Sequence, residues 1–218
     1  MQPLLFPKTA LRFYLLIVSL LLFSACSTTP EKKTGNKTTW SSHKTTLNAI
    51  QKWQINGRFS VKTATENWTG SLTWRQEKQA YKINISGPLS TGSIQLEGDE
   101  NLVQLRHSKN RFASDSNPQS LLHEHTGLTL PVNELRYWLR GIPYPPGTTS
   151  IMQFDKHGQL RRLKQNNWEI RFKRYTDVNI GTGTLQLPNK IFLVNQAFNV
   201  RLIIQQWQIF TNEQLSRP

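Results

Sequence analysis

Residues 53–61, WQINGRFSV, alternate between apolar and polar side chains, and this alternation decides the fold class. The apolar positions that share one face of the chain are Trp53, Ile55, Phe59 and Val61. A period of two residues is that of a β-strand, whereas a helix repeats its apolar residues every three to four positions. Gly57 interrupts the pattern where a bulge or bend would fit. The stretch therefore predicts a long, half-buried strand.

The same period of two continues along most of the chain. Further stretches that show it are residues 68–74, 81–85, 93–97, 102–106, 150–155, 159–165, 168–175, 184–194 and 198–210. Turn signals separate them, such as EGDEN at residues 97–101. Consecutive short strands joined by turns are typical of an antiparallel meander. We expect a mainly β fold of about ten or eleven strands in one strongly curved or barrel-like sheet.

Two short helical patterns interrupt the strands. Residues 117–127, NPQSLLHEHTG, begin with an Asn-Pro start signal and end at a glycine. Residues 131–141 place Leu135, Trp138 and Leu139 at helical spacing between a proline and a glycine. We expect these two helices to cover one opening of the sheet.

The N-terminus has the pattern of an export signal. Residues 1–12 contain basic but no acidic side chains, and the apolar run at 13–23 is too short to span a bilayer. Two small residues then precede Cys26, the only cysteine of the chain. This pattern resembles the lipobox of bacterial lipoproteins, with Phe23 where leucine is usual, and implies cleavage before Cys26 and its modification by lipid. An ordinary signal peptide with an incidental cysteine is the alternative.

The chain divides into four parts on these patterns. They are a signal peptide (1–25), a flexible tether from the lipidated cysteine (26–42), a single domain (43–210) and an unassigned tail (211–218). The tether is polar and rich in Lys and Thr, so it cannot bury enough apolar surface to order itself. Ser42 is placed to cap a short helix that follows it. Ser27, in the position after the lipobox cysteine, implies sorting to the outer membrane.

The charge of the chain points to an anionic neighbour. It has 27 Lys and Arg against 13 Asp and Glu, a formal net charge of +14. Such an excess is typical of proteins that bind nucleic acid, an anionic membrane surface or an acidic partner. Export argues against a role with cellular nucleic acid. The basic residues alternate with apolar ones at 159–165 and 168–175, which leaves open a solvated outer face or a surface attracted to anionic lipid or an acidic partner.

The sequence contains no familiar catalytic signature. It lacks GxSxG, HExxH and CxxC patterns, and a lipidated Cys26 is unavailable as a thiol nucleophile. HEH at residues 123–125 diverges on a helix and has no second cluster of ligands, so we expect neither metal nor cofactor. GTG at 181–183 lacks the setting of a phosphate loop. We therefore expect a protein that is not an enzyme.

Several stretches together resemble the LolB family of outer-membrane lipoproteins. They are residues 53–61, 87–97, 128–143 (LTLPVNELRYWLRGIP), 168–175, 187–193 and 200–207. The resemblance implies an incomplete antiparallel β-barrel with a helical lid over a hydrophobic cavity. It also implies a monomeric receptor that takes lipoproteins from a soluble, LolA-like periplasmic carrier and inserts them into the inner leaflet of the outer membrane. A lipid-anchored hydrolase acting on envelope polymers, or a structural envelope protein, is the alternative.

The stretch ISGPLSTG, residues 85–92, carries a leucine where a turn is normally polar. The resemblance implies that Leu89, with Gly87 and Pro88, forms a loop that enters the membrane; packing back onto the domain is the alternative. Candidates for core or acyl-chain cavity are Trp53, Phe59, Leu72, Trp74, Ile83, Ile85, Ile94, Leu96, Leu105, Leu135, Trp138 and Leu139. The sequence does not divide lining from core, and we expect at least half of them to be plain core.

Overall fold

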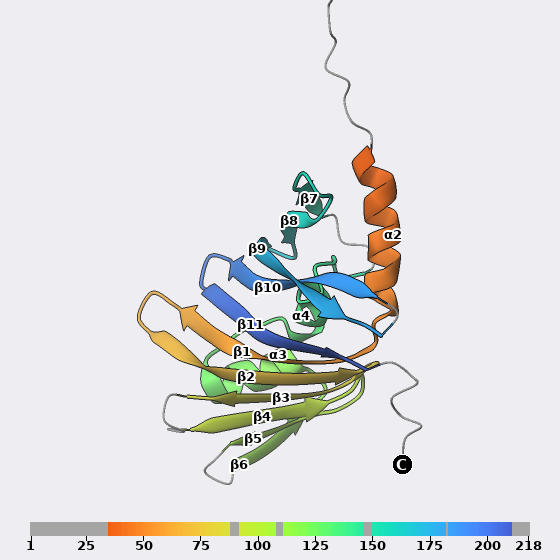
Figure 1. Ribbon diagram of the computed structural model, residues 1–218. Helices are drawn as coiled ribbons and strands as arrows, with labels where there is room; N and C mark the ends of the chain where they lie inside the picture. The colour runs from red at the N-terminus through yellow and green to blue at the C-terminus, as the bar shows by residue number, and fades with distance from the viewer. Residues whose placement is uncertain (1–34, 88–91, 108–110, 146–149, 182, 211–218) are drawn as a thin grey trace, which may run out of the picture. The chain divides into compact units, whose positions relative to one another are not determined.

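One antiparallel sheet of eleven strands forms most of the molecule (Figure 1). The computed structural model describes residues 35–87, 92–107, 111–145, 150–181 and 183–210. The strands are β1 (Lys52–Lys62), β2 (Asn67–Glu77), β3 (Ala80–Ser86), β4 (Ser93–Gly98), β5 (Val103–His107), β6 (Arg111–Asp115), β7 (Ile151–Phe154), β8 (Leu160–Gln165), β9 (Trp168–Asn179), β10 (Thr184–Val194) and β11 (Asn199–Ile209). Their order, β6-β5-β4-β3-β2-β1-β11-β10-β9-β8-β7, leaves β6 and β7 as the two edges. The predicted mainly β fold is confirmed, as an open sheet.

The strand predicted at residues 53–61 lies at the centre of this sheet. β1 pairs with β2 on one side and with β11 on the other. The register with β11 shifts between Asn56 and Gly57, so the predicted bulge is confirmed. Glycine is required there because a Cβ atom at Gly57 would lie 2.3 Å from the carbonyl oxygen of Ile203 in β11. Pairing of β1 with β11 joins the first and last thirds of the chain into one curved surface.

Substitution of Gly57 by alanine is expected to lower the melting temperature by several degrees. The added methyl group meets backbone, which cannot rotate away, and overpacking of this kind costs about 1–3 kcal/mol. Thermal unfolding followed by circular dichroism measures the effect. Ser71→Ala, at an exposed position of β2, is the control and is expected to change little. An unchanged melting temperature for Gly57→Ala would show that β1 and β11 can separate at the bulge without cost.

Helices α3 (Pro118–Thr126) and α4 (Val132–Trp138) lie against the sheet between β6 and β7 in the chain (Figure 1). The side chain of Asn117 caps α3 by accepting hydrogen bonds from the amides of Gln119 and Ser120 at 2.9 and 3.2 Å. α3 ends at Gly127 in the left-handed conformation, φ 73°. Both predicted helices are confirmed. We call α3, α4 and residues 127–131 between them the helical lid.

The N-terminal helix α2 spans Gly35–Ala49, so the prediction that it starts after Ser42 is wrong. The carbonyl of Ser42 accepts a hydrogen bond from Thr46 Oγ1 at 3.2 Å, as a residue inside a helix does. Trp40 packs its ring 5.0 Å from that of Phe154 in β7. This tertiary contact stabilises a polar segment whose own composition favours no structure.

Strand β6 was absent from the sequence prediction. It contains a single large apolar residue, Phe112, which is 57% exposed, and it pairs only with β5 in the described sheet. An edge strand exposes one side and much of its length to water, so it needs no alternation of apolar residues. The periodicity that identifies the central strands is therefore missing here.

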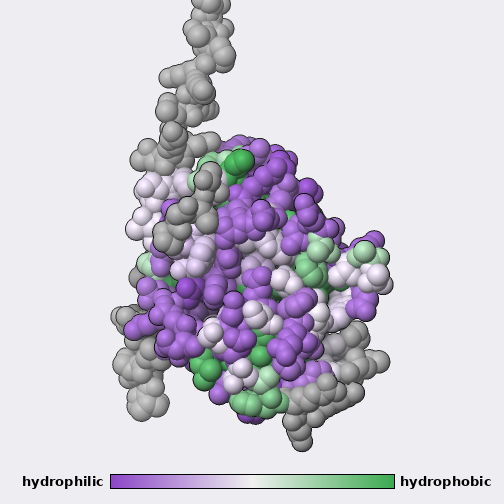
Figure 2. Space-filling view, turned by 180° about the vertical axis from the view of Figure 1, so that it is seen from behind, coloured by the Kyte–Doolittle hydropathy of each residue, from purple (hydrophilic) through white to green (hydrophobic). Residues whose placement is uncertain are grey.

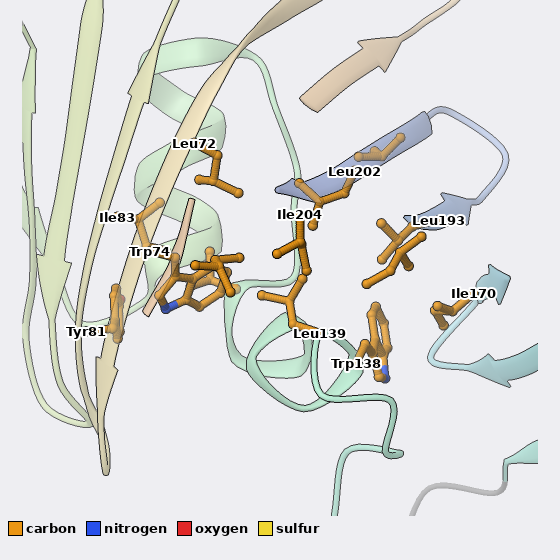
Figure 3. Close-up of a cluster of buried hydrophobic side chains, with 14 of the residues drawn as sticks. Leu72, Trp74, Tyr81, Ile83, Trp138, Leu139, Ile170, Leu193, Leu202 and Ile204 are labelled. Carbon is orange, nitrogen blue, oxygen red and sulfur yellow. The ribbon is translucent and has the colours of Figure 1, made fainter. Parts of the chain in front are cut away.

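The core fills the space inside the curved sheet. Trp53 is buried and its ring centroid lies 5.8 Å from that of Trp74 and 5.5 Å from that of Trp207. Figure 3 shows Trp138 and Leu139 of the lid region between side chains of the two halves of the sheet. The lid is thus part of the core and closes it.

Candidate functional site

An apolar cavity of about 70 Å³ lies between the sheet and the helical lid. It is lined by apolar residues alone: Phe59, Val61, Leu72, Trp74, Ile83, Ile85, Leu96, Leu122, Leu128, Leu130, Pro131, Val132, Leu135, Leu139, Trp168, Leu193, Val200 and Leu202. On the face seen in Figure 2 the surface is mainly hydrophilic, with apolar residues in small separate groups. That face therefore displays no continuous apolar surface.

Helix α4 supplies the wall of the cavity opposite the sheet. Val132, Leu135 and Leu139 line the cavity at spacings of three and four residues, which place side chains on one face of a helical segment. Across the cavity, the strands present every second residue to the same face of the sheet, as Leu72 and Trp74 do in β2. The cavity is therefore lined on one side by residues at helical spacing and on the other by alternate residues of the strands.

Eight of the predicted candidates line this cavity. They are Phe59, Leu72, Trp74, Ile83, Ile85, Leu96, Leu135 and Leu139. Trp53, Leu105 and Trp138 are buried elsewhere in the core, and Ile94 packs against it half-buried. The indole Nε1 of Trp138 donates to Gln165 Oε1 at 2.9 Å, which anchors the end of α4 to β8. The part that each lining residue plays in binding remains a prediction.

The candidate set omits the cavity residues that come from the second half of the sheet. Trp168, Leu193, Val200 and Leu202 all line the cavity. Their strands show the same alternation as the first half, so the signal was present in the sequence. The alternation does not reveal which strands line the same cavity, because that depends on the pairing of β1 with β11.

The loop predicted to enter the membrane is described only at its base. The amide of Gly87 donates a hydrogen bond to the carbonyl of Gly92 at 3.0 Å, so these two residues close the loop between β3 and β4. Pro88 and Leu89 lie outside the described residues, and so does Cys26. Within the described part of the chain, no helix has both the length and the apolar character to cross a bilayer.

The described residues hold no cluster of three or more His, Cys, Asp or Glu side chains that would bind a metal. His123, in the HEH stretch, lies with Nδ1 2.9 Å from Thr129 Oγ1, a contact that links α3 to the residues after it. The cavity itself offers neither acid nor base. What the site can do chemically is bury an apolar ligand without forming specific polar contacts.

Comparison with known proteins agrees with this geometry. The family model described as "Outer membrane lipoprotein LolB" matches residues 51–207. The outer-membrane lipoprotein LolB of Pseudomonas aeruginosa is 34% identical over 203 residues, covering 91% of this chain and 96% of the relative. That of Nitrosococcus oceani is 34% identical over 200 residues, covering 91% and 98%.

Among solved structures, a putative outer membrane lipoprotein-sorting protein domain from Vibrio parahaemolyticus superimposes with a TM-score of 0.50 at 9% identity. The match covers 78% of this chain and 92% of that domain, and at this identity it concerns the fold alone. The family match, by contrast, spans most of the sheet and the whole lid. The chain therefore belongs to the LolB family of outer-membrane lipoproteins, and this membership confirms the receptor function, the non-enzymatic class and the outer-membrane location expected from the sequence.

Proposed function

We propose that this chain takes lipoproteins from a soluble, LolA-like carrier by enclosing their acyl chains in the cavity under the lid. It then releases them into the inner leaflet of the outer membrane. The observation that carries the proposal is a cavity lined only by apolar side chains between the sheet and a short helix. Burial of an acyl chain is worth about 0.8 kcal/mol per CH₂ group. A chain of about a dozen such groups would cost on the order of 10 kcal/mol to expose to water.

Apolar burial also explains how one site accepts many cargoes. The hydrophobic effect has no direction and scales with the area removed from water. A site without polar groups therefore binds any acyl chain and ignores the protein attached to it. Onward transfer follows if the site binds acyl chains better than the carrier does and less well than the bilayer does.

The cavity must enlarge to hold an acyl chain. An engineered cavity of about 150 Å³ binds a single benzene molecule, and this one measures about 70 Å³. The sheet is held by continuous backbone hydrogen bonding, whereas α4 is a helix of only seven residues. We place the enlargement in the helical lid, because it contacts the sheet through side chains, including the Trp138–Gln165 hydrogen bond, and not through a backbone ladder.

Lipidation of Cys26 and insertion of Leu89 complete the proposal. The lipid would hold the domain at the membrane, and a leucine at the tip of the β3–β4 loop would orient it. Full burial of one leucine is worth about 1.5–3 kcal/mol, which favours contact with the bilayer but does not trap the domain there. The proposed receptor acts as a monomer.

Transfer of cargo tests the proposal directly. The protein is mixed with a purified complex of carrier and lipoprotein, and the two are separated by affinity chromatography. We expect the lipoprotein to move to this protein without any added energy source, because the difference in acyl-chain burial drives the step. Lipoprotein that stays on the carrier under these conditions would rule out the receptor step.

A further inference from the structure

A second pocket, of about 370 Å³, lies on another side of α4. Its lining includes Lys44, Asn48, Lys78, Arg136, Arg140 and Tyr144. The whole lining comes from α2 and the segment after it, from β1, from the end of β2 with the β2–β3 turn, and from α4 with the segment after it. The turn at Lys78 lies at the opposite end of β3 from Gly87 and the predicted membrane loop. The volume falls within the usual range for small-molecule sites, roughly 300–1,000 Å³.

The charge of this pocket is positive only. Its four charged residues are Lys44, Lys78, Arg136 and Arg140, and no carboxylate lines it. Within the described part of the chain, none of the four makes an ion pair. Glu77, next to Lys78 in sequence, is paired instead with Lys52 at 2.5 Å. Four cations that line one pocket with no carboxylate in the lining give it a positive potential, which an anionic ligand would neutralise.

Arg140 is the most buried of these charges, with 6% of its surface exposed. Its Nη1 donates to the carbonyls of Leu47 and Ile50 at 3.0 and 2.7 Å, and its Nε donates to Arg136 O at 3.1 Å. Burial lowers the pKa of Arg140 to about 10. The contacts to the end of α2 satisfy part of the hydrogen-bonding capacity of this guanidinium.

Arg136 is also incompletely satisfied. Its Nη1 donates to Gln79 Oε1, while its buried Nε has no partner within the described structure. The guanidinium carbon lies 5.0 Å from the centre of the Tyr137 ring, which orients the group by cation–π attraction. The hydrogen bonds of Arg140 to the end of α2 explain why a charge is buried at that position. They do not explain why Arg136, Lys44 and Lys78 line the same pocket.

We infer that this pocket binds a phosphate-class oxyanion between α2, α4 and the β2–β3 turn. Guanidinium and ammonium groups with free N–H donors match the several acceptor oxygens of a phosphate. Phenol and amide groups of Tyr144 and Asn48 lie in the same lining for the uncharged part of a ligand. The phosphate comes from one of two sources, the headgroup of an anionic phospholipid or the free ion. This inference does not depend on the acyl-chain cavity.

Calorimetric titration of the whole lipidated chain in phosphatidylcholine nanodiscs tests the inference. The probes are inorganic phosphate and glycerophosphoglycerol, the headgroup of phosphatidylglycerol without its acyl chains. The test variant is Lys44→Gln with Lys78→Gln, which removes two charges from the pocket. The matched control is Lys156→Gln with Lys173→Gln, which removes two exposed charges outside it.

We expect at least one probe to bind and the pocket variant to bind it roughly tenfold more weakly, with the control unchanged. Glycerophosphoglycerol that binds more tightly than phosphate would assign the site to a lipid headgroup, and equal binding would assign it to the free ion. No binding by either probe below about 10 mM would overturn the inference. An equal loss in the two double variants would do so as well, because it would show only an attraction to net charge. Cargo transfer is measured separately, so either proposal can fail alone.

Discussion

Glutamate in place of Leu135 is expected to lower lipoprotein transfer from carrier to receptor at least about tenfold while the protein stays folded. Leu135 lines the apolar cavity from α4 and is only partly buried, so a carboxylate there can reach water in the free protein. With an acyl chain in the cavity, that carboxylate would face apolar carbon without a hydrogen-bond partner. The cost of this desolvation falls on the bound state alone. Transfer assays and thermal unfolding measure the two effects separately.

Asn133→Glu is the matched control for this variant. Asn133 lies exposed on the same helix, outside the cavity lining, and the substitution adds the same charge. We expect normal transfer from it. Equal transfer by Leu135→Glu and Asn133→Glu would mean that acyl chains bind elsewhere than under α4.

Leu89→Glu is expected to separate uptake from delivery. In the proposed mechanism uptake from the carrier uses the cavity, so uptake should remain normal. Transfer onward into liposomes should fall at least about tenfold, because a carboxylate is costly to move into a bilayer. The same preparation of loaded protein serves for both measurements. Cargo retained on the protein after incubation with liposomes is the expected signature.

Leu89→Met is the control, since it keeps an apolar side chain of similar volume at the same position. It should deliver cargo at the normal rate. A fall in both uptake and delivery, with a lower melting temperature, would show that Leu89 packs as core. Normal delivery by Leu89→Glu would show that the loop has no part in membrane insertion.

Much of the fold is readable from local pattern. The alternation in residues 53–61 and the cap at Asn117 each depend on residues a few positions apart. Steric and hydrogen-bonding preferences of that kind act within one strand or one turn. They predict elements of the right type in nearly the right places.

Two errors came from segments whose structure depends on distant partners. α2 is longer than predicted, and Trp40 within it contacts Phe154, which is more than a hundred positions away. β6 exists because β5 offers it backbone hydrogen bonds, although its own residues lack the alternation. Tertiary contacts supply stability that neither segment has by itself.

The sequence by itself determined the strand and helix types, the family and the supply of apolar residues for a cavity. Only the tertiary structure decided which of them share that cavity, because the pairing of β1 with β11 brings Phe59 opposite Leu202. The basic pocket is likewise assembled from Lys44, Lys78 and Arg136, on three separate segments. The periodicity and composition of a sequence predict structure over a few neighbouring residues. The walls of a pocket are set by which distant strands and helices pack together, and no local pattern contains that information.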